Sequence, residues 1–437
     1  MDKKILGVCL GFVFSSMVGQ AAFAEDLWTI YELAKKNDPT YAAAVAQYFA
    51  DQEQSPQAWA GVLPQLNLSG SHREFDGDSV VANVPESGKY STDSYSLTLN
   101  QTIFDNAKFN AISQADALVA KAEAEYNNAA HDLILRAAER YFNVLTESEN
   151  VVFAEAETKA IAQQLNQAKQ RFNVGLTAIT DVHEAQARYD TSVSAEIEAR
   201  RLLDTSREIL RELTNQEPHN LAKVKPDYVM VSPEPENIDT WVKSGLNNNL
   251  LLLSAKKSMD AAREAVNVAR SGHYPTLDLQ ADYTDTDSGG GFVRSNKGTT
   301  VGLVLNLPLY LGGAVNSTSR QTAALYMQSK ELYEKQRRAT ERLTRNSYLT
   351  VLSSLSQVAA LKQSLISTQT ALEATQAGFD VGTRTAVEVL DSQREMFRAQ
   401  RDYIRARHAY ILATLVLKQA AGTLNAEDVK LINNWLE

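Results

Sequence analysis

Residues 171–182 run Arg171-Phe-Asn-Val-Gly-Leu-Thr-Ala-Ile-Thr-Asp-Val182, and a closely related stretch, Gly378-Phe-Asp-Val-Gly382, follows 207 residues later. Two further windows, one around Leu97 and one around Asn37, recur at offsets of 206 and 211 residues. Three windows that recur in the same order at nearly one offset indicate an internal duplication. The chain is therefore predicted to consist of two copies of one structural unit.

The sequence around the first stretch has the composition of long helices. Gly175 is the only glycine between Lys89 and Glu217, and this interval contains no proline before residue 218. A helix from about Ala107 to Arg171 would be roughly 100 Å long at 1.5 Å per residue. Apolar residues recur there every three or four positions, which predicts a single buried helical face: 118, 122, 126, 129, 133, 137, 141 and 144.

A single glycine then reverses the chain at each repeated stretch. Gly175 precedes a predicted helix from about Ile179 to Leu213, and Gly382 precedes one from about Ala386 to Ala420. Glycine readily adopts the positive φ that ends a helix. Each half is therefore predicted to contain a helical hairpin with arms of unequal length.

The N-terminus and the prolines divide the chain. Lys3 and Lys4 precede an apolar run and the sequence Ala22-Phe23-Ala24, which is typical of a secretory signal peptide. Four of the ten prolines lie between residues 217 and 239, where regular structure should break. The predicted domains are a signal peptide at 1–24, a first repeat at 25–216, a proline-rich linker at 217–239 and a second repeat at 240–437.

Composition argues against several functions. Lys and Arg total 43 against 53 Asp and Glu, a net charge of −10, so no basic surface for nucleic acid is expected. The single cysteine, Cys9, lies in the predicted signal peptide. His183-Glu184 lacks the second histidine of a zinc-protease helix, and Gly289-Gly-Gly291 precedes no helix that would bind phosphate. We therefore expect no enzyme activity, no cofactor and no metal site.

Each half also contains stretches in which apolar and polar residues alternate, as in β-strands. Leu66 and Leu68 alternate with polar neighbours in the first half, as Leu277 does in the second. The intervals 76–91 and 284–298 are rich in Gly, Ser and Asp and are predicted to be solvent-facing loops between strands.

This alternation fits two environments. One is a half-buried sheet in a soluble protein, and the other is a set of tilted strands of about ten residues that cross a bilayer. Four strands cannot close a barrel, and lipid does not tolerate an open edge, so a membrane sheet would be shared between chains. Its polar, water-filled interior would be lined by Asn67, Asp278, Gln280 and Asp282.

The tip sequences resemble the outer-membrane efflux protein family. The resemblance rests on residues 171–182, on Val381-Gly-Thr-Arg-Thr-Ala-Val-Glu-Val-Leu-Asp391 and on the ending Ala421-Gly-Thr-Leu-Asn-Ala-Glu-Asp428, and it extends over the chain after residue 24. It implies an α + β membrane protein that forms a homotrimer. In this homotrimer, a twelve-stranded outer-membrane β-barrel with four strands per chain is continuous with a long barrel of twelve helices.

The resemblance also implies a conduit rather than an enzyme. Such channels export small molecules, proteins or both, in drug efflux and type I secretion. They lie in the lipid of the Gram-negative outer membrane, extend into the periplasm, and act with a periplasmic adaptor (membrane fusion) protein and an inner-membrane transporter. One alternative stays open on the residues alone: an exported periplasmic coiled-coil protein with a structural role.

In this family, the periplasmic end of the channel is held shut by links near the helical tips. The matching positions here are Asp181 and Arg384, a pair of opposite charges, with Thr180 and Gln164 as candidate neighbours. Phe379 stands where the family has a tyrosine, so no hydroxyl is available there to bond Asp181. An exposed salt link contributes only about 0 to 1 kcal/mol, which suits a gate that must open. Both charges also suit solvent-facing positions at helix starts.

Two acidic residues follow Arg384. Glu388 and Asp391 match the acids that ring the family's inner constriction, although Asp is usual at position 388. Three chains would place six carboxylates around one passage and favour cations. Thr385-Ala-Val-Glu388 also fits a capping box, in which Glu388 bonds only a backbone N–H.

The ends of the hairpins are candidates for adaptor contacts. Small apolar residues at a hairpin end can enter a groove of a partner, although they also suit a turn that closes a helix without any partner. The expected contact residues are Val174, Gly175, Leu176, Val381, Gly382 and Thr383.

Overall fold

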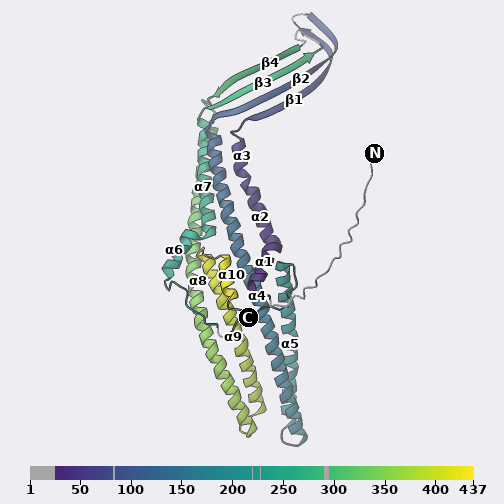
Figure 1. Ribbon diagram of the computed structural model, residues 1–437, viewed down its shortest axis with the longest axis vertical. Coiled ribbons are helices and arrows are strands. Elements are labelled where there is room, and N and C mark those ends of the chain that lie inside the picture. Colours follow the sequence, from purple (N-terminus) through teal and green to yellow (C-terminus); the bar gives the residue numbers. More distant parts are fainter. Residues whose placement is uncertain (1–24, 82–83, 219, 227, 290–294) are drawn as a thin grey trace, which may run out of the picture.

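The computed structural model describes residues 25–81, 84–218, 220–226, 228–289 and 295–437, so the predicted signal peptide lies outside the described residues. The molecule is elongated, with a four-stranded sheet at one end and two helical tips at the other (Figure 1). In chain order the elements are α1 (Leu27–Asn37), α2 (Pro39–Gln52), α3 (Gln54–Ala60), β1 (Gln65–Val81), β2 (Val84–Asp105), α4 (Asn106–Asn173), α5 (Ile179–Thr214), α6 (Ile238–Asn248), α7 (Leu250–Arg270), η1 (Ser271–His273), β3 (Thr276–Ser288), β4 (Ser295–Asn306), α8 (Ala314–Asp380), α9 (Ala386–Ala420) and α10 (Ala426–Asn433).

Each half has the same order of elements. Short helices lead into a pair of strands, and the strands lead into a long helix that reverses at a tip into a shorter one. The long helix α4 packs along α5, and α8 packs along α9, so both predicted hairpins are confirmed (Figure 1). Among the described residues, no helix combines the length and the apolar character needed to cross a membrane.

The long helices follow the apolar spacing of the sequence. The helix α4 has 68 residues, which is about 100 Å. The structure buries Ala122, Leu133, Ala137, Tyr141 and Val144 on its predicted face. The predicted bounds of α9 are confirmed at both ends, and α5 extends one residue beyond its predicted end.

The sheet separates an apolar from a polar face. Its strands are all antiparallel, in the order β1-β2-β3-β4, so β1 and β4 are its edges. Leu66 is aligned through Leu99 and Ala281 with Val301, whereas the adjacent row is polar and includes Asp282. Leu66 is 68% exposed and Val301 is 66% exposed, so this chain leaves its apolar face uncovered.

The predicted loops at 76–91 and 284–298 are wrong over most of their length. Strands β1 and β2 continue to residues 81 and 84, and β3 and β4 to residues 288 and 295. Directly opposite charges join the strands there, with Lys89 Nζ 3.1 Å from Asp76 and Lys297 Nζ 2.8 Å from Asp285. Cross-strand pairs of this kind stabilise a sheet and override the turn-like composition.

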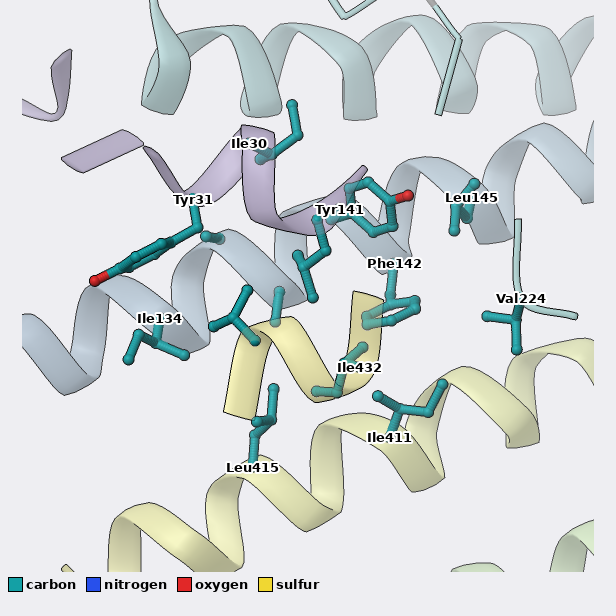
Figure 2. Close-up of a cluster of buried hydrophobic side chains, with 14 of the residues drawn as sticks. Ile30, Tyr31, Ile134, Tyr141, Phe142, Leu145, Val224, Ile411, Leu415 and Ile432 are labelled. Atoms are coloured by element: carbon teal, nitrogen blue, oxygen red, sulfur yellow. The ribbon is translucent and has the colours of Figure 1, made fainter. Parts of the chain in front are cut away.

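The main hydrophobic core lies halfway along the helices, where α1 and α10 cover α4 and α9 (Figures 1 and 2). The helix α10 was not predicted. The chain between α5 and α6 adds Val224, which forms an isolated bridge with Leu436. We call this core the central cluster; it includes Ile30, Tyr31, Ile134, Tyr141, Phe142, Leu145, Val224, Ile411, Leu415 and Ile432.

Candidate gate at the helical tips

Both hairpins end in the same type of turn. At the first tip, the N–H of Gly175 donates to Phe172 O at 2.9 Å, and the N–H of Leu176 donates to Arg171 O at 2.8 Å. These two bonds define a Schellman motif, which needs a left-handed residue after the helix. Gly175 supplies it with φ 76°, and Gly382 supplies it at the second tip with φ 79°.

The structure places the predicted gate pair around one cavity. This cavity of about 190 Å³ lies behind the tips, and both Asp181 and Arg384 line it. Asp181 accepts a hydrogen bond from Thr177 Oγ1, and no ion pair within the described residues joins it to Arg384. The other residues that line the cavity include Gln164, Ala168, Arg171 and Phe379.

Arg384, which precedes the N-cap of α9, is bound to the first turn of that helix. Its Nη1 atom lies 2.7 Å from Glu388 Oε1, and Glu388 also accepts the Thr385 N–H at 2.7 Å, which completes a capping box. The Thr385 backbone N–H, followed by Arg384 and the Thr385 hydroxyl, lowers the pKa of Glu388 to about 2. The capping alternative is therefore present, and the role of Glu388 in a constriction ring stays a prediction.

Two contacts link the hairpins beside the cavity. Phe379 is buried, and the guanidinium carbon of Arg171 lies 4.3 Å from the centre of its ring, a cation–π contact between α8 and α4. Gln164 Nε2 donates to Gln376 Oε1 at 3.3 Å. Thr180 is exposed at the start of α5. Phe379, which has no hydroxyl, thus contributes an aromatic contact instead.

Asp391 has a partner on the other hairpin. Its Oδ1 atom accepts a hydrogen bond from Arg188 Nη2 at 3.0 Å, which joins α9 to α5. Arg394, on the same helix as Asp391, lies 3.7 Å away. The carboxylate predicted to face the passage is therefore engaged by two arginines.

A small apolar cluster holds these helices together near the tips. Its residues come from α4, α5 and α9, and Val182 and Tyr189 pack against it. We call it the tip cluster; it consists of Ile161, Leu165, Ala168, Ala185 and Leu390.

The ends of the hairpins are exposed in the part of the chain that the structure describes. Val174, Leu176 and Val381 are strongly exposed. Thr383 is also exposed, and its hydroxyl donates to Gly378 O at 3.0 Å, so it belongs to the turn itself. Contact of these residues with an adaptor stays a prediction.

Four residues of this region were not predicted from sequence. Arg171, Thr177, Arg188 and Gln376 make the contacts described above. A signal existed for Arg188, because it follows Asp181 by seven residues, or about two helical turns, and so shares its helix face.

The polar face of the sheet is a second candidate site. Asp282 accepts hydrogen bonds from Thr98 at 2.7 Å and from Ser96 at 3.2 Å. Within the described ranges, no group of three or more His, Cys, Asp or Glu residues is placed to hold a metal ion. The arrangement of both sites suits a passage for solutes.

Comparison with known proteins gives a concordant set of matches. The model of the family described as outer membrane efflux protein matches residues 30–216 and 241–423. Outer membrane protein TolC of Vibrio cholerae serotype O1 is 34% identical over 440 residues, covering 100% of this chain and 99% of that protein. Proteases secretion protein PrtF of Dickeya chrysanthemi is 27% identical over 435 residues, covering 97% and 94%. The crystal structure of outer membrane protein VceC from Vibrio cholerae matches with a TM-score of 0.78 at 20% identity, over 91% of this chain and 96% of that one.

Proposed function

The chain belongs to the outer membrane efflux protein family, and on this premise we propose that it is an outer-membrane channel for efflux and type I secretion. The channel would carry small molecules, proteins or both from the cell through the periplasm. The family's description supports efflux, and the name of the relative PrtF supports protein secretion.

The observation that carries the proposal is the uncovered apolar face of the sheet. Such a face is stable against lipid, but the unpaired edges of β1 and β4 are not, because lipid offers no partners for backbone N–H and C=O groups. We infer that three copies pair edge to edge and close a barrel of about twelve strands. Asn67, Asp278, Gln280 and Asp282 would line its interior.

The long helices extend the passage away from the membrane. The helices α4 and α8 contain 68 and 67 residues, about 100 Å each. Three copies would continue the barrel as a helical tunnel through the periplasm. The domain boundaries of this proposal are a removed leader at 1–24, repeats at 25–216 and 240–437, and a linker at 217–239. The strand pair followed by a helical hairpin in both halves supports the two repeats.

The tips would form the periplasmic gate. Asp181 and Arg384 line one cavity together with Gln164 and Phe379, and Thr180 lies exposed at the start of α5. Glu388 and Asp391 would surround the constriction. The exposed residues at 174–176 and 381–383 would contact an adaptor, which would connect the channel to an inner-membrane transporter.

Single-channel conductance in planar bilayers tests this proposal. Purified wild-type protein should give small, cation-preferring steps, and Arg384→Ser should enlarge them. Arg342→Ser, an exposed arginine of α8, is the matched control and should leave them unchanged. Unchanged steps in Arg384→Ser would keep the channel but reject Arg384 as a latch, whereas complete absence of conductance would favour the structural coiled-coil alternative.

A further inference from the structure

The tips contain a second pair of opposite charges behind the first. Arg188 follows Asp181 by seven residues on α5, and Asp391 follows Arg384 by seven residues on α9. On α5, seven residues are about two helical turns, so Arg188 lies on the same face as Asp181. Arg384 directly precedes the N-cap of α9, and Asp391 lies in the second turn of that helix. The signs are exchanged, since the base is now on α5 and the acid on α9.

The two pairs differ in their bonding. Arg188 Nη2 lies 3.0 Å from Asp391 Oδ1, so the second pair is joined. In the first pair, Arg384 binds Glu388 at 2.7 Å, and Asp181 accepts its hydrogen bond from Thr177. Of the two pairs, the one further from the turn is therefore the one that spans the hairpins within the described residues.

The surroundings of the second pair favour a holding role. Among ion pairs of the described residues that join the two hairpins, it lies nearest to the tips; Arg401 and Glu157 form the next one along the helices. Two residues of the tip cluster are close to the pair in sequence. Ala185 lies about one helical turn before Arg188, and Leu390 is next to Asp391. The Arg188 side chain is 33% exposed and that of Asp391 is 43% exposed, so solvent screens the pair only in part.

We propose that the Arg188–Asp391 ion pair is the latch that holds α5 against α9 in the closed gate, an inference that rests on the proposed channel function. Arg188 acts as a positioning residue, because it fixes the tip rather than contacting the solute. Within the described residues, Asp181 and Arg384 each bind a partner on their own hairpin, so the second pair adds a direct link across the hairpins that the first pair does not make.

Opening the tip by separating α5 from α9 must break this pair in every copy. Each exposed or partly exposed pair of this kind shifts the balance between closed and open tips by up to about five-fold. Loss of the pair in all three copies should therefore give a clear increase in open probability or step size.

The experiment compares three variants with the wild type in planar bilayers. Arg188→Gln removes the link between the hairpins and should raise the open probability about five-fold or more. Arg188→Lys keeps the charge and should stay close to the wild type. The matched control is Arg398→Gln, which removes an arginine of α9 whose ion pairs, with Glu395 and Asp402, stay within that helix, so it should leave conductance unchanged.

A distance measurement gives a second readout that does not require conductance. Leu176→Cys and Val381→Cys provide exposed spin-label sites at the two tips, and the chain has no cysteine other than Cys9. Arg188→Gln should broaden the distance between these labels toward longer values. The same broadening with Arg398→Gln, or none with Arg188→Gln, would overturn the latch.

Failure of the latch differs from failure of the channel. Conductance that rises in Arg384→Ser but not in Arg188→Gln would assign the latch to the first pair. A wild type that does not conduct would contradict the channel, and the label distances would still decide whether Arg188 holds α5 against α9.

Discussion

The central cluster and the tip cluster are built on the same helices, but they differ in depth. At the centre, α1 and α10 cover α4 and α9, and large side chains such as Tyr141, Phe142 and Leu415 are completely enclosed (Figure 2). At the tips, the described residues of α4, α5 and α9 share the small tip cluster, among partly exposed polar links.

This difference assigns the two regions different mechanical roles. Burial stabilises by about 25 cal/mol per Å² of apolar surface, so the centre fixes the helices relative to one another. The tip depends on little apolar burial and on polar links that contribute about 0 to 1 kcal/mol each. It can therefore open locally while the rest of the chain stays folded.

The largest expected effect comes from truncating a buried leucine to alanine in each of the two regions. Leu415 is 1% exposed in the central cluster and Leu390 is 4% exposed in the tip cluster. Leu415→Ala should lower the free energy of unfolding by about 2–5 kcal/mol, followed by circular dichroism during urea denaturation. Leu390→Ala should lower it less, because the thin tip can collapse around the gap. An equal loss in both variants would break the comparison.

Acidification should weaken the centre before the tip. Burial, with a smaller effect of Arg407, lowers the pKa of His408 from 6.5 to about 4, and His408 is neutral where it bonds Thr146. The unfolded chain binds the proton first, so stability present above pH 6.5 is lost as the pH falls toward 4, by up to about 3 kcal/mol. The pKa of Glu388 is lowered from 4.5 to about 2. The stability that its capping box gives to the tip is therefore kept until the pH falls below 4.5.

Unfolding measured at pH 7 and pH 4.5 checks this order. His408→Gln is the control, since it removes the titrating group and should flatten the dependence between these values. A wild-type stability that does not change over this range would show that His408 does not distinguish the centre from the tip.

A smaller effect is expected from the turn itself. Gly382 has φ 79° and no atom within 4 Å of an added Cβ, so Gly382→Ala costs only backbone strain, about 1–2 kcal/mol. Limited proteolysis at the tip should become about 5–30-fold faster. Gly302→Ala, which has similar free space without a positive φ, should not change the rate. Equal rates in both variants would show that the turn does not limit opening.

Local patterns in the sequence were sufficient to predict the helices that lead to and from the tips, although not α10. The proline-free intervals and the apolar spacing predicted α4, α5 and α9 because a helix is decided by neighbours three and four residues away. The alternation at Leu66 and Leu68 likewise predicted β1. These features each depend on a short window of the chain.

The rest depends on contacts between distant residues. The strands continue past Asp76 because Lys89 lies opposite it, although the local composition predicts a turn. Asp181 and Arg384 line one cavity, yet the ion pair nearest the tips that joins the hairpins connects Arg188 with Asp391, 203 residues apart. Such pairing follows from how the hairpins pack, which no local window contains.

Hydrogen exchange followed by mass spectrometry tests the contrast between the two regions most directly. In the purified wild-type protein, amides of residues 161–168 and 385–391 should exchange through local opening, far sooner than those of residues 133–145 and 410–417. Arg188→Gln should speed exchange only at the tips. Equal protection of both regions, or faster exchange at the centre in that variant, would contradict a gate that opens on a fixed core.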